Sequence, residues 1–226
     1  MMTVHGSSFP FEKGLLLSTG DAMQAPGPQN AMLQAGHKSW IGDSDLDALV
    51  LAETGIPMNS TNATILEFDF VPLIDEMSFD FIFASEEYGT FQCDFSDSFA
   101  FLLTDSEGTT KNIALVPGTE IPVSVVTIRD SKYNNACSSE NAEYFDKFNV
   151  GVLNAPVSPT NYDGQTVVLT AQSIVTPNTS YHIKMVIADR GGDFEDTRLD
   201  SAVFLAGGSF NIGSATLGPD LTVADG

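Results

Sequence analysis

The chain has 226 residues, and its 30 acidic against 9 basic side chains give a formal net charge of −21 at pH 7. A field of this sign repels nucleic acid and anionic lipid, so functions that depend on binding phosphate groups are excluded. Because 42% of the residues are hydrophobic and 16 are phenylalanine, the chain can form a core and is not a disordered acidic tail.

Cysteine usage and the chain ends indicate little about the compartment. Cys93 and Cys137 fit neither a zinc site nor a CxxC motif, and are equally consistent with one disulfide and with two free thiols. No apolar run approaches the ~20 residues that span a bilayer, so no direct membrane insertion is expected. The start lacks the pattern of a signal peptide. We expect one domain over residues 1–217, with 218–226 a linker or the start of a following domain.

Two-residue periodicity runs through most of the chain. Thr64–Phe70 places apolar residues at 66, 68 and 70 on one face, and Met77–Phe83 does the same at 77, 79, 81 and 83. Turn-forming residues separate further predicted strands at Gly14–Thr19, Ser98–Thr104, Asn112–Val116, Pro122–Ile128, Thr166–Ala171, Tyr181–Ala188 and Ser201–Ala206. This pattern predicts an all-β, two-sheet antiparallel sandwich with long ordered loops, and a jelly roll is the favoured arrangement.

One short helix is predicted over Ser44–Leu51, with Ser44 as its N-cap. The acidic run Asp43–Asp47 is similar to the start of an EF-hand loop. However, Ala48 stands where that loop needs glycine and Thr54 stands where it needs glutamate. Helix capping is therefore the preferred interpretation of this run.

Two segments share one plan, in which an apolar strand leads through an acidic loop and an Asp-Ser pair into a second apolar strand. The loops cover residues 85–97 and 189–200. If each segment is a hairpin, carboxylates from both ends of a loop come together and repel one another unless a cation binds. Calcium suits such a site, because it takes 6–8 oxygen ligands. The predicted metal ligands are Glu86, Glu87, Asp97, Asp189 and Asp200, with Asp94, Asp193 and Asp196 in reserve; solvated acidic turns are the alternative.

Aromatic residues in the predicted loops offer a surface for a ligand. Trp40, Tyr88 and Tyr133 are the candidates, since an aromatic ring beside a cation can stack on the apolar face of a sugar. The alternative is that these rings pin the long loops to the sandwich.

Signatures of hydrolytic enzymes are absent from the sequence. It has no Gly-x-Ser-x-Gly motif. Glu86 and Glu87 are adjacent and would point to opposite sides of an extended segment, so they cannot flank one glycosidic bond. Glu86 with Asp97 or with Asp200 stays open as a catalytic pair, but we expect the chain not to be an enzyme.

Six motifs in order resemble the choice-of-anchor L family, a group of bacterial surface or secreted modules. They are Gly14–Gly20 (GLLLSTG), Leu66–Phe70 (LEFDF), Phe83–Tyr88 (FASEEY), Asp97–Phe101 (DSFAF), Val116–Thr119 (VPGT) and Asp200–Leu205 (DSAVFL). The resemblance implies a secreted or cell-surface bacterial location, with neighbouring domains of a larger surface protein as partners.

These observations favour a calcium-stabilised extracellular module that binds or adheres to a glycan or peptide ligand through its acidic loops. Two alternatives are a structural spacer in a long adhesin or filament and a hydrolase acting on polysaccharide.

Overall fold

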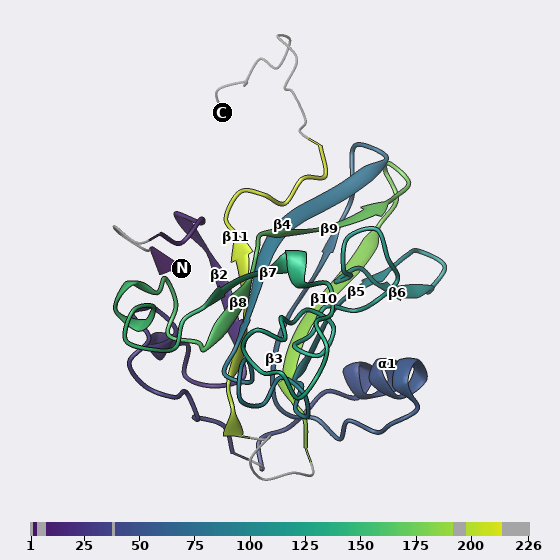
Figure 1. Cartoon of the computed structure of the whole chain (residues 1–226). Helices are drawn as coiled ribbons and strands as arrows, with labels where there is room; N and C mark the ends of the chain where they lie inside the picture. Colours follow the sequence, from purple (N-terminus) through teal and green to yellow (C-terminus); the bar gives the residue numbers. More distant parts are fainter. Residues whose placement is uncertain (1, 4–7, 38, 192–197, 214–226) are drawn as a thin grey trace.

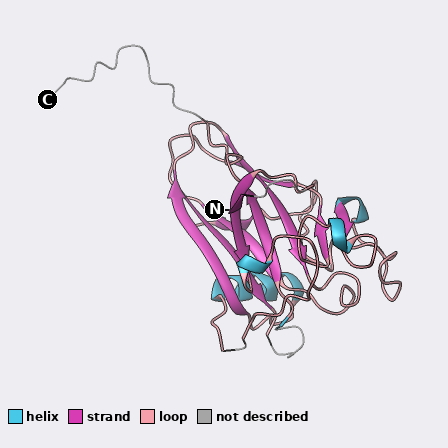
Figure 2. Ribbon diagram, turned by 90° about the vertical axis from the view of Figure 1, so that its left-hand side faces the viewer, coloured by secondary structure: helices cyan, strands magenta, loops and turns pink. Residues whose placement is uncertain are grey.

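The protein folds as two antiparallel β-sheets packed face to face, with one α-helix beside the smaller sheet (Figures 1 and 2). The structure, a computed structural model, describes residues 2–3, 8–37, 39–191 and 198–213. The larger sheet has seven strands in the order β1-β2-β11-β4-β8-β7, and β9 pairs with β4 beside that path. The smaller sheet has four, in the order β3-β10-β5-β6. This arrangement confirms the predicted all-β sandwich with one helix.

The bounds of the elements are as follows. The larger sheet contains β1 (Met2–Thr3), β2 (Lys13–Ser18), β4 (Glu76–Ser85), β7 (Phe145–Phe148), β8 (Gly164–Thr166), β9 (Leu169–Ile174) and β11 (Ser201–Ala206). The smaller sheet contains β3 (Thr61–Phe70), β5 (Ser98–Thr104), β6 (Thr110–Asn112) and β10 (Tyr181–Asp189). The helices are α1 (Ser44–Thr54) and the 3-10 turns η1 (Ala22–Gln24), η2 (Ala142–Tyr144) and η3 (Ala155–Val157).

The core lies between the inner faces of the two sheets. Phe79 and Phe81 of β4 face Phe101 of β5, each with ring centroids 5.0 Å apart and an edge-to-face geometry. The pairing uses the favourable quadrupole arrangement of aromatic rings. The alternating apolar positions of the predicted strands therefore do mark the buried face.

Three predicted strands, Pro122–Ile128, Asn112–Val116 and Thr166–Ala171, differ from the structure. The last is divided between the end of β8 at Thr166 and the start of β9 at Leu169. Pro122–Ile128 forms a turn, because the Thr127 hydroxyl donates to the Pro122 carbonyl and the Ile128 amide donates to the Ser124 carbonyl. Strand β6 ends at Asn112, whose side-chain oxygen accepts from the amides of Phe101 and Ala114 in place of a backbone ladder.

Helix α1 covers the outer face of the smaller sheet (Figure 1). Leu46 and Val50 of the helix pack against Ala100 and Val186 of that sheet. The N-cap is Asp43 rather than the predicted Ser44, since the Asp43 carboxylate accepts from the amides at 45 and 46. Aspartate at this position also complements the helix dipole.

The two acidic segments are not hairpins, and this corrects their predicted geometry. Each one crosses from one sheet to the other: β4 leads into β5, and β10 leads into β11. The strands then pair between the two segments, with Ser201 opposite Ser85 and Ser98 opposite Ala188. Both acidic loops are thereby brought to the same end of the sandwich.

Candidate functional site

The carboxylates at this end are buried rather than displayed. Glu86, Glu87, Asp97 and Asp189 are fully buried, and Asp200 is 2% exposed. The reserve residue Asp94 is exposed, while Asp193 and Asp196 lie outside the described residues. Five predicted residues therefore lie together in the interior, where an uncompensated charge is costly.

Glu87 has a structural role within its own loop. Both of its carboxylate oxygens accept from the amide of Asp97, at 3.1 and 2.9 Å, and its own amide donates to the Ser85 hydroxyl. These bonds tie the end of β4 to the start of β5. The prediction that Glu87 lies near Asp97 is correct, but its oxygens are already engaged.

Asp200 and Asp189 are positioned by neighbouring loops. The amide of Ala35 donates to both carboxylate oxygens of Asp200, at 2.9 and 3.1 Å. Gly20 presses against the same carboxylate so closely that a β-carbon there would collide with it. The Asn62 side chain donates to Asp189 at 2.5 Å, and Asp189 also lies beside Asp97. Backbone and amide donors thus hold these carboxylates without neutralising them.

Glu86 is the exceptional member of the group. Its backbone amide donates to the Asp200 carbonyl at 3.1 Å, which fixes the residue across the junction of the two segments. Its carboxyl group lies within reach of the Leu33 backbone and the Asp163 side chain, although neither oxygen forms a hydrogen bond of good geometry with a described residue. A buried carboxylate with so few donors is costly in a protein interior.

Asp163 is a site residue that was not predicted from the sequence, because it lies outside the two acidic loops. It lies next to Glu86, and the Gln29 side chain donates to it at 3.2 Å. Asp163, Glu86, Asp200, Asp189 and Asp97 then form a row in which each side chain interacts electrostatically with the next. We call these five residues the acidic row; it passes from the larger sheet to the smaller.

Burial governs the protonation of the acidic row. Burial, together with the charge of Asp163, raises the pKa of Glu86 to about 9. Burial likewise raises the pKa of Asp189 to about 8, with a contribution from Asp200, against hydrogen bonds that lower it. The pKa values of Asp163 and Asp200 rise to about 6, again chiefly through burial. The pKa values of Glu86 and Asp189 therefore lie above neutral pH.

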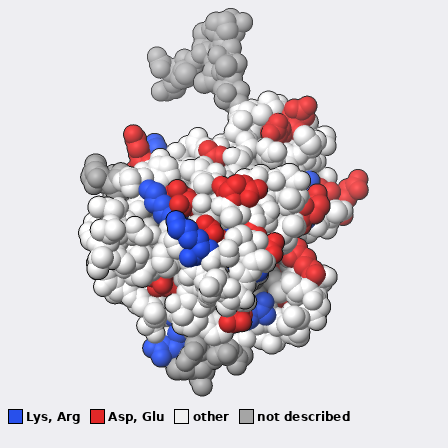
Figure 3. Space-filling view, viewed as in Figure 1, with Lys and Arg blue, Asp and Glu red and all other residues white. Residues whose placement is uncertain are grey.

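Basic side chains do not offset this charge at Glu86, Asp189 or Asp200, none of which forms an ion pair with a described lysine or arginine. The ion pairs of the described residues join Arg129 to Glu140 and Lys184 to Asp43 and Asp45, with His182 between Glu67 and Asp69. Acidic side chains elsewhere are scattered over the surface (Figure 3). Within the described residues, no three acidic, histidine or cysteine side chains already form a group arranged to hold a metal.

The pH dependence of stability is expected to reveal the acidic row. Carboxyls in an unfolded chain titrate near pH ~4, so the folded state binds more protons up to the pKa of about 9 of Glu86. The stability from these groups is complete below about pH 4 and is lost as pH rises toward that value. In chelator, we expect Glu86→Gln to gain stability over the wild type between about pH 5 and about pH 8. Urea unfolding of both proteins measures this, and a difference independent of pH would contradict it.

The three aromatic residues predicted to contact a ligand differ in their exposure to solvent. Tyr88 is fully buried, with its ring 4.7 Å from that of Phe145, so its prediction as a ligand platform is wrong. Tyr133 is half-buried and stacks on Phe148 at 4.5 Å, which matches the alternative of loop pinning. Trp40 is 53% exposed and is free to contact a ligand.

Trp40 lines an open groove of about 450 Å³ beside the acidic row. Gly20 and Asn62, which also line it, contact Asp200 and Asp189 respectively. The exposed Ile41 adds a second apolar side chain. The shape of the groove is therefore coupled directly to the position of the carboxylates.

A disulfide links the first acidic loop to a distant segment. Cys93 and Cys137 are bonded, with their α-carbons 5.5 Å apart. The Asn134 side chain adds a hydrogen bond to the Gly89 carbonyl. This answers the question that the sequence left open between a disulfide and two free thiols.

The architecture defines an antiparallel β-sandwich module with a buried acidic end. Residues 2–211 match the choice-of-anchor L domain, and the chain belongs to that family. The family places it in a surface-associated bacterial protein. No curated protein and no solved structure matches the chain significantly. Among the described residues, no helix is long and apolar enough to cross a membrane.

Proposed function

We propose that this domain is a calcium-stabilised binding module of a bacterial surface protein. The ion would be held by carboxylates of the acidic row, with Glu86, Asp189 and Asp200 as its principal ligands. The observation that carries the proposal is Glu86, whose side chain is fully buried beside the acidic side chains of Asp163 and Asp200. Calcium takes several carboxylate and carbonyl oxygens in flexible geometry, which suits a row of acids at the junction of two loops.

Calcium would act on the loops through charge. Neighbouring carboxylates of the row repel one another when they are ionised, and a divalent cation would offset that repulsion. Gly20 and Asn62 line the groove and contact Asp200 and Asp189, so an ion held by these acids would fix the groove beside Trp40. That groove is the proposed contact surface for an extracellular glycan or peptide.

Catalysis is not part of the proposal. Glu86 is the carboxyl with the highest pKa in the row, but its side chain is fully buried in the part of the chain that the structure describes. A general acid must come within hydrogen-bond reach of the group that it protonates.

Binding of glycans and peptides in the presence of calcium tests the proposal that the groove beside Trp40 recognises a ligand. Glycan and peptide arrays would be probed with wild type, with Trp40→Ala and with Leu153→Ala, which removes an 85%-exposed apolar side chain elsewhere. We expect Trp40→Ala and chelator each to weaken binding by about tenfold or more, since a stacked aromatic anchor carries much of the affinity. Leu153→Ala should bind as wild type does.

The outcomes separate the proposed function from the spacer alternative. A domain that melts at a calcium-dependent temperature but captures nothing on either array would be a structural spacer. Binding that persists unchanged in chelator and in Trp40→Ala would overturn the groove as the recognition surface.

A further inference from the structure

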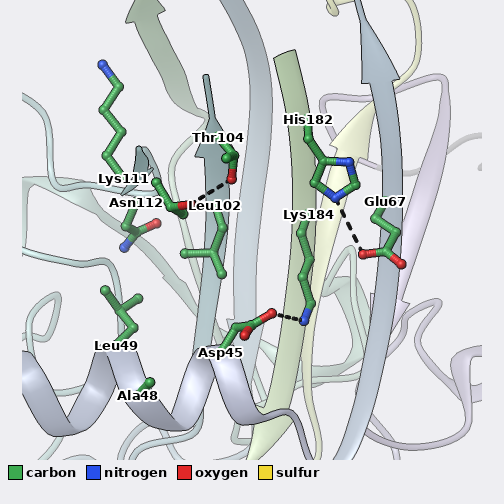
Figure 4. Close-up of a pocket in the computed structure, with 11 residues that line it drawn as sticks. Asp45, Ala48, Leu49, Glu67, Leu102, Thr104, Lys111, Asn112, His182 and Lys184 are labelled. Atoms are coloured by element: carbon green, nitrogen blue, oxygen red, sulfur yellow. Dashed lines mark hydrogen bonds and ion pairs between the residues drawn. The ribbon is translucent and has the colours of Figure 1, made fainter. Parts of the chain in front are cut away.

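A second concave surface lies on the outer face of the smaller sheet, away from the acidic row. It is a cleft of about 480 Å³, within the roughly 300–1,000 Å³ of small-molecule sites. Its walls are the first turns of α1 and the exposed part of the sheet, and its lining is drawn in Figure 4. Helix α1 covers only the part of this face that contains Ala100 and Val186, so the part that contains Thr104 and His182 is open.

Strand register explains which side chains line the cleft. Two rows of facing residues run across the four strands on the outer face, the first beyond α1 and the second meeting the helix at Leu102. The rows are Asp69–His182–Thr104–Thr110 and Glu67–Lys184–Leu102–Asn112. Residues opposite one another in a sheet project from the same face, so the rows form one continuous polar floor.

The polar groups of this floor are held in place by one another. The Thr104 and Thr110 hydroxyls are 2.7 Å apart, and the Lys184 ammonium lies 2.6 Å from the Asp45 carboxylate. His182 lies between Glu67, at 3.6 Å, and Asp69, at 2.8 Å. The dashed lines of Figure 4 mark three of these contacts. Groups fixed in this way lose little entropy on binding a ligand.

Hydrogen-bonding capacity remains after these contacts are made. The side chains of Asp45 and Glu67 are 61% and 55% exposed, so both carboxylates keep free acceptor positions. The exposed Thr104 and Thr110 hydroxyls can each accept a hydrogen bond as well as donate one. Carboxylate acceptors and hydroxyls are thus available to a ligand along the cleft.

An apolar strip accompanies the polar floor. Leu102 lies at the centre of the floor, and Ala48 and Leu49 face it from α1 (Figure 4). A ligand that fits must present hydroxyls that both donate and accept, together with a flat apolar face. A saccharide ring has both properties, and an uncharged one avoids the repulsion that a chain of net charge −21 exerts on anionic glycans.

We propose that this cleft, formed by α1 and the outer face of β3-β10-β5-β6, binds a neutral saccharide of one or two rings. The site is separate from the acidic row and from the groove beside Trp40. Binding here therefore does not require calcium.

The proposal is tested by ¹⁵N-HSQC titration of the folded domain with neutral mono- and disaccharides of glucose, galactose, mannose and N-acetylglucosamine. Ala48→Trp fills the cleft from an exposed position of α1. Leu51→Trp places the same ring on the same helix at a residue that does not line the cleft. We expect Ala48→Trp to weaken binding by about tenfold or more and Leu51→Trp to change it by less than about twofold, because only the first blocks the site.

Three further results bear on the same site. Shifts confined to β10, β6 and α1 that persist in chelator and in Trp40→Ala support the cleft as an independent site. Shifts centred on residues 18–20 and 40–41 would overturn it, because the saccharide would then occupy the other groove. Shifts with cadaverine but with none of the saccharides would also overturn it, since the floor would then select a cation.

Discussion

Removal of calcium is expected to lower the unfolding temperature of the domain by about 5–10 °C. An ion present at 100 times its dissociation constant adds roughly 2.7 kcal/mol to stability. For a domain of this size each kcal/mol moves the midpoint by about 2–4 °C. Differential scanning calorimetry of the same sample in millimolar calcium and in chelator measures the shift.

Glu86→Gln is expected to abolish most of that shift while preserving the fold. The amide keeps the shape of the side chain but removes the charge that calcium would bind. In chelator the variant should melt no lower than wild type, because the buried charge is costly without a cation. The variant would thus lose its response to calcium without losing stability in chelator. A simple loss of packing would instead lower the stability in both conditions.

Asp94→Asn provides the matched control for this experiment. Asp94 lies in the same loop but is exposed, and the substitution also removes one negative charge. If general charge reduction were responsible, both variants would respond alike. Identical melting curves for wild type with calcium and with chelator would contradict a calcium site at the acidic row.

The strands were predictable because their inner faces alternate in the sequence. Phe79, Phe81 and Phe83 alternate with polar or outward-facing residues, and the structure buries all three. The bounds of β5 and β11 match the prediction, since an acidic loop ends at an Asp-Ser pair immediately before each. Period-two patterns report the face of a strand reliably where one side is buried.

The connection of those strands was not predictable from the same pattern. The sequence pattern of a strand, a loop and a second strand is the same for a hairpin within one sheet and for a connection that crosses to the other sheet. Strand β4 pairs with β11, more than 100 residues away, and this long-range register places Glu86 beside Asp200. The candidate ligands were therefore identified individually, while their grouping across the two segments was missed.

The burial of these acidic side chains could not be predicted from the sequence either. Acidic loop residues are normally exposed, so nothing local distinguishes Glu86 from the exposed Asp94. The acidic row is covered by residues 18–35 and 161–163, which are far in the sequence from the two acidic loops. Tyr162 illustrates this, since its buried hydroxyl lies 3.1 Å from that of Ser18 beside the row.

Loss of the Cys93–Cys137 disulfide is expected to destabilise the domain by about 4 kcal/mol, because the bond closes a long loop in the unfolded chain. The cysteines are 44 residues apart in the sequence. That free energy corresponds to a fall of about 8–16 °C in the unfolding temperature. The variant with both cysteines replaced by serine, compared with wild type in calorimetry, measures it.

The same variant tests whether the disulfide supports the acidic row. Cys93 lies between Glu87 and Asp97, so its bond to Cys137 limits the motion of the loop that carries both residues. Loosening that loop should weaken calcium affinity as well as lower the melting temperature, because an ion must then order its own ligands. Reduced wild type should behave as the double variant does. An unchanged calcium response in a destabilised variant would show that Glu86, Asp189 and Asp200 hold the ion without help from this loop.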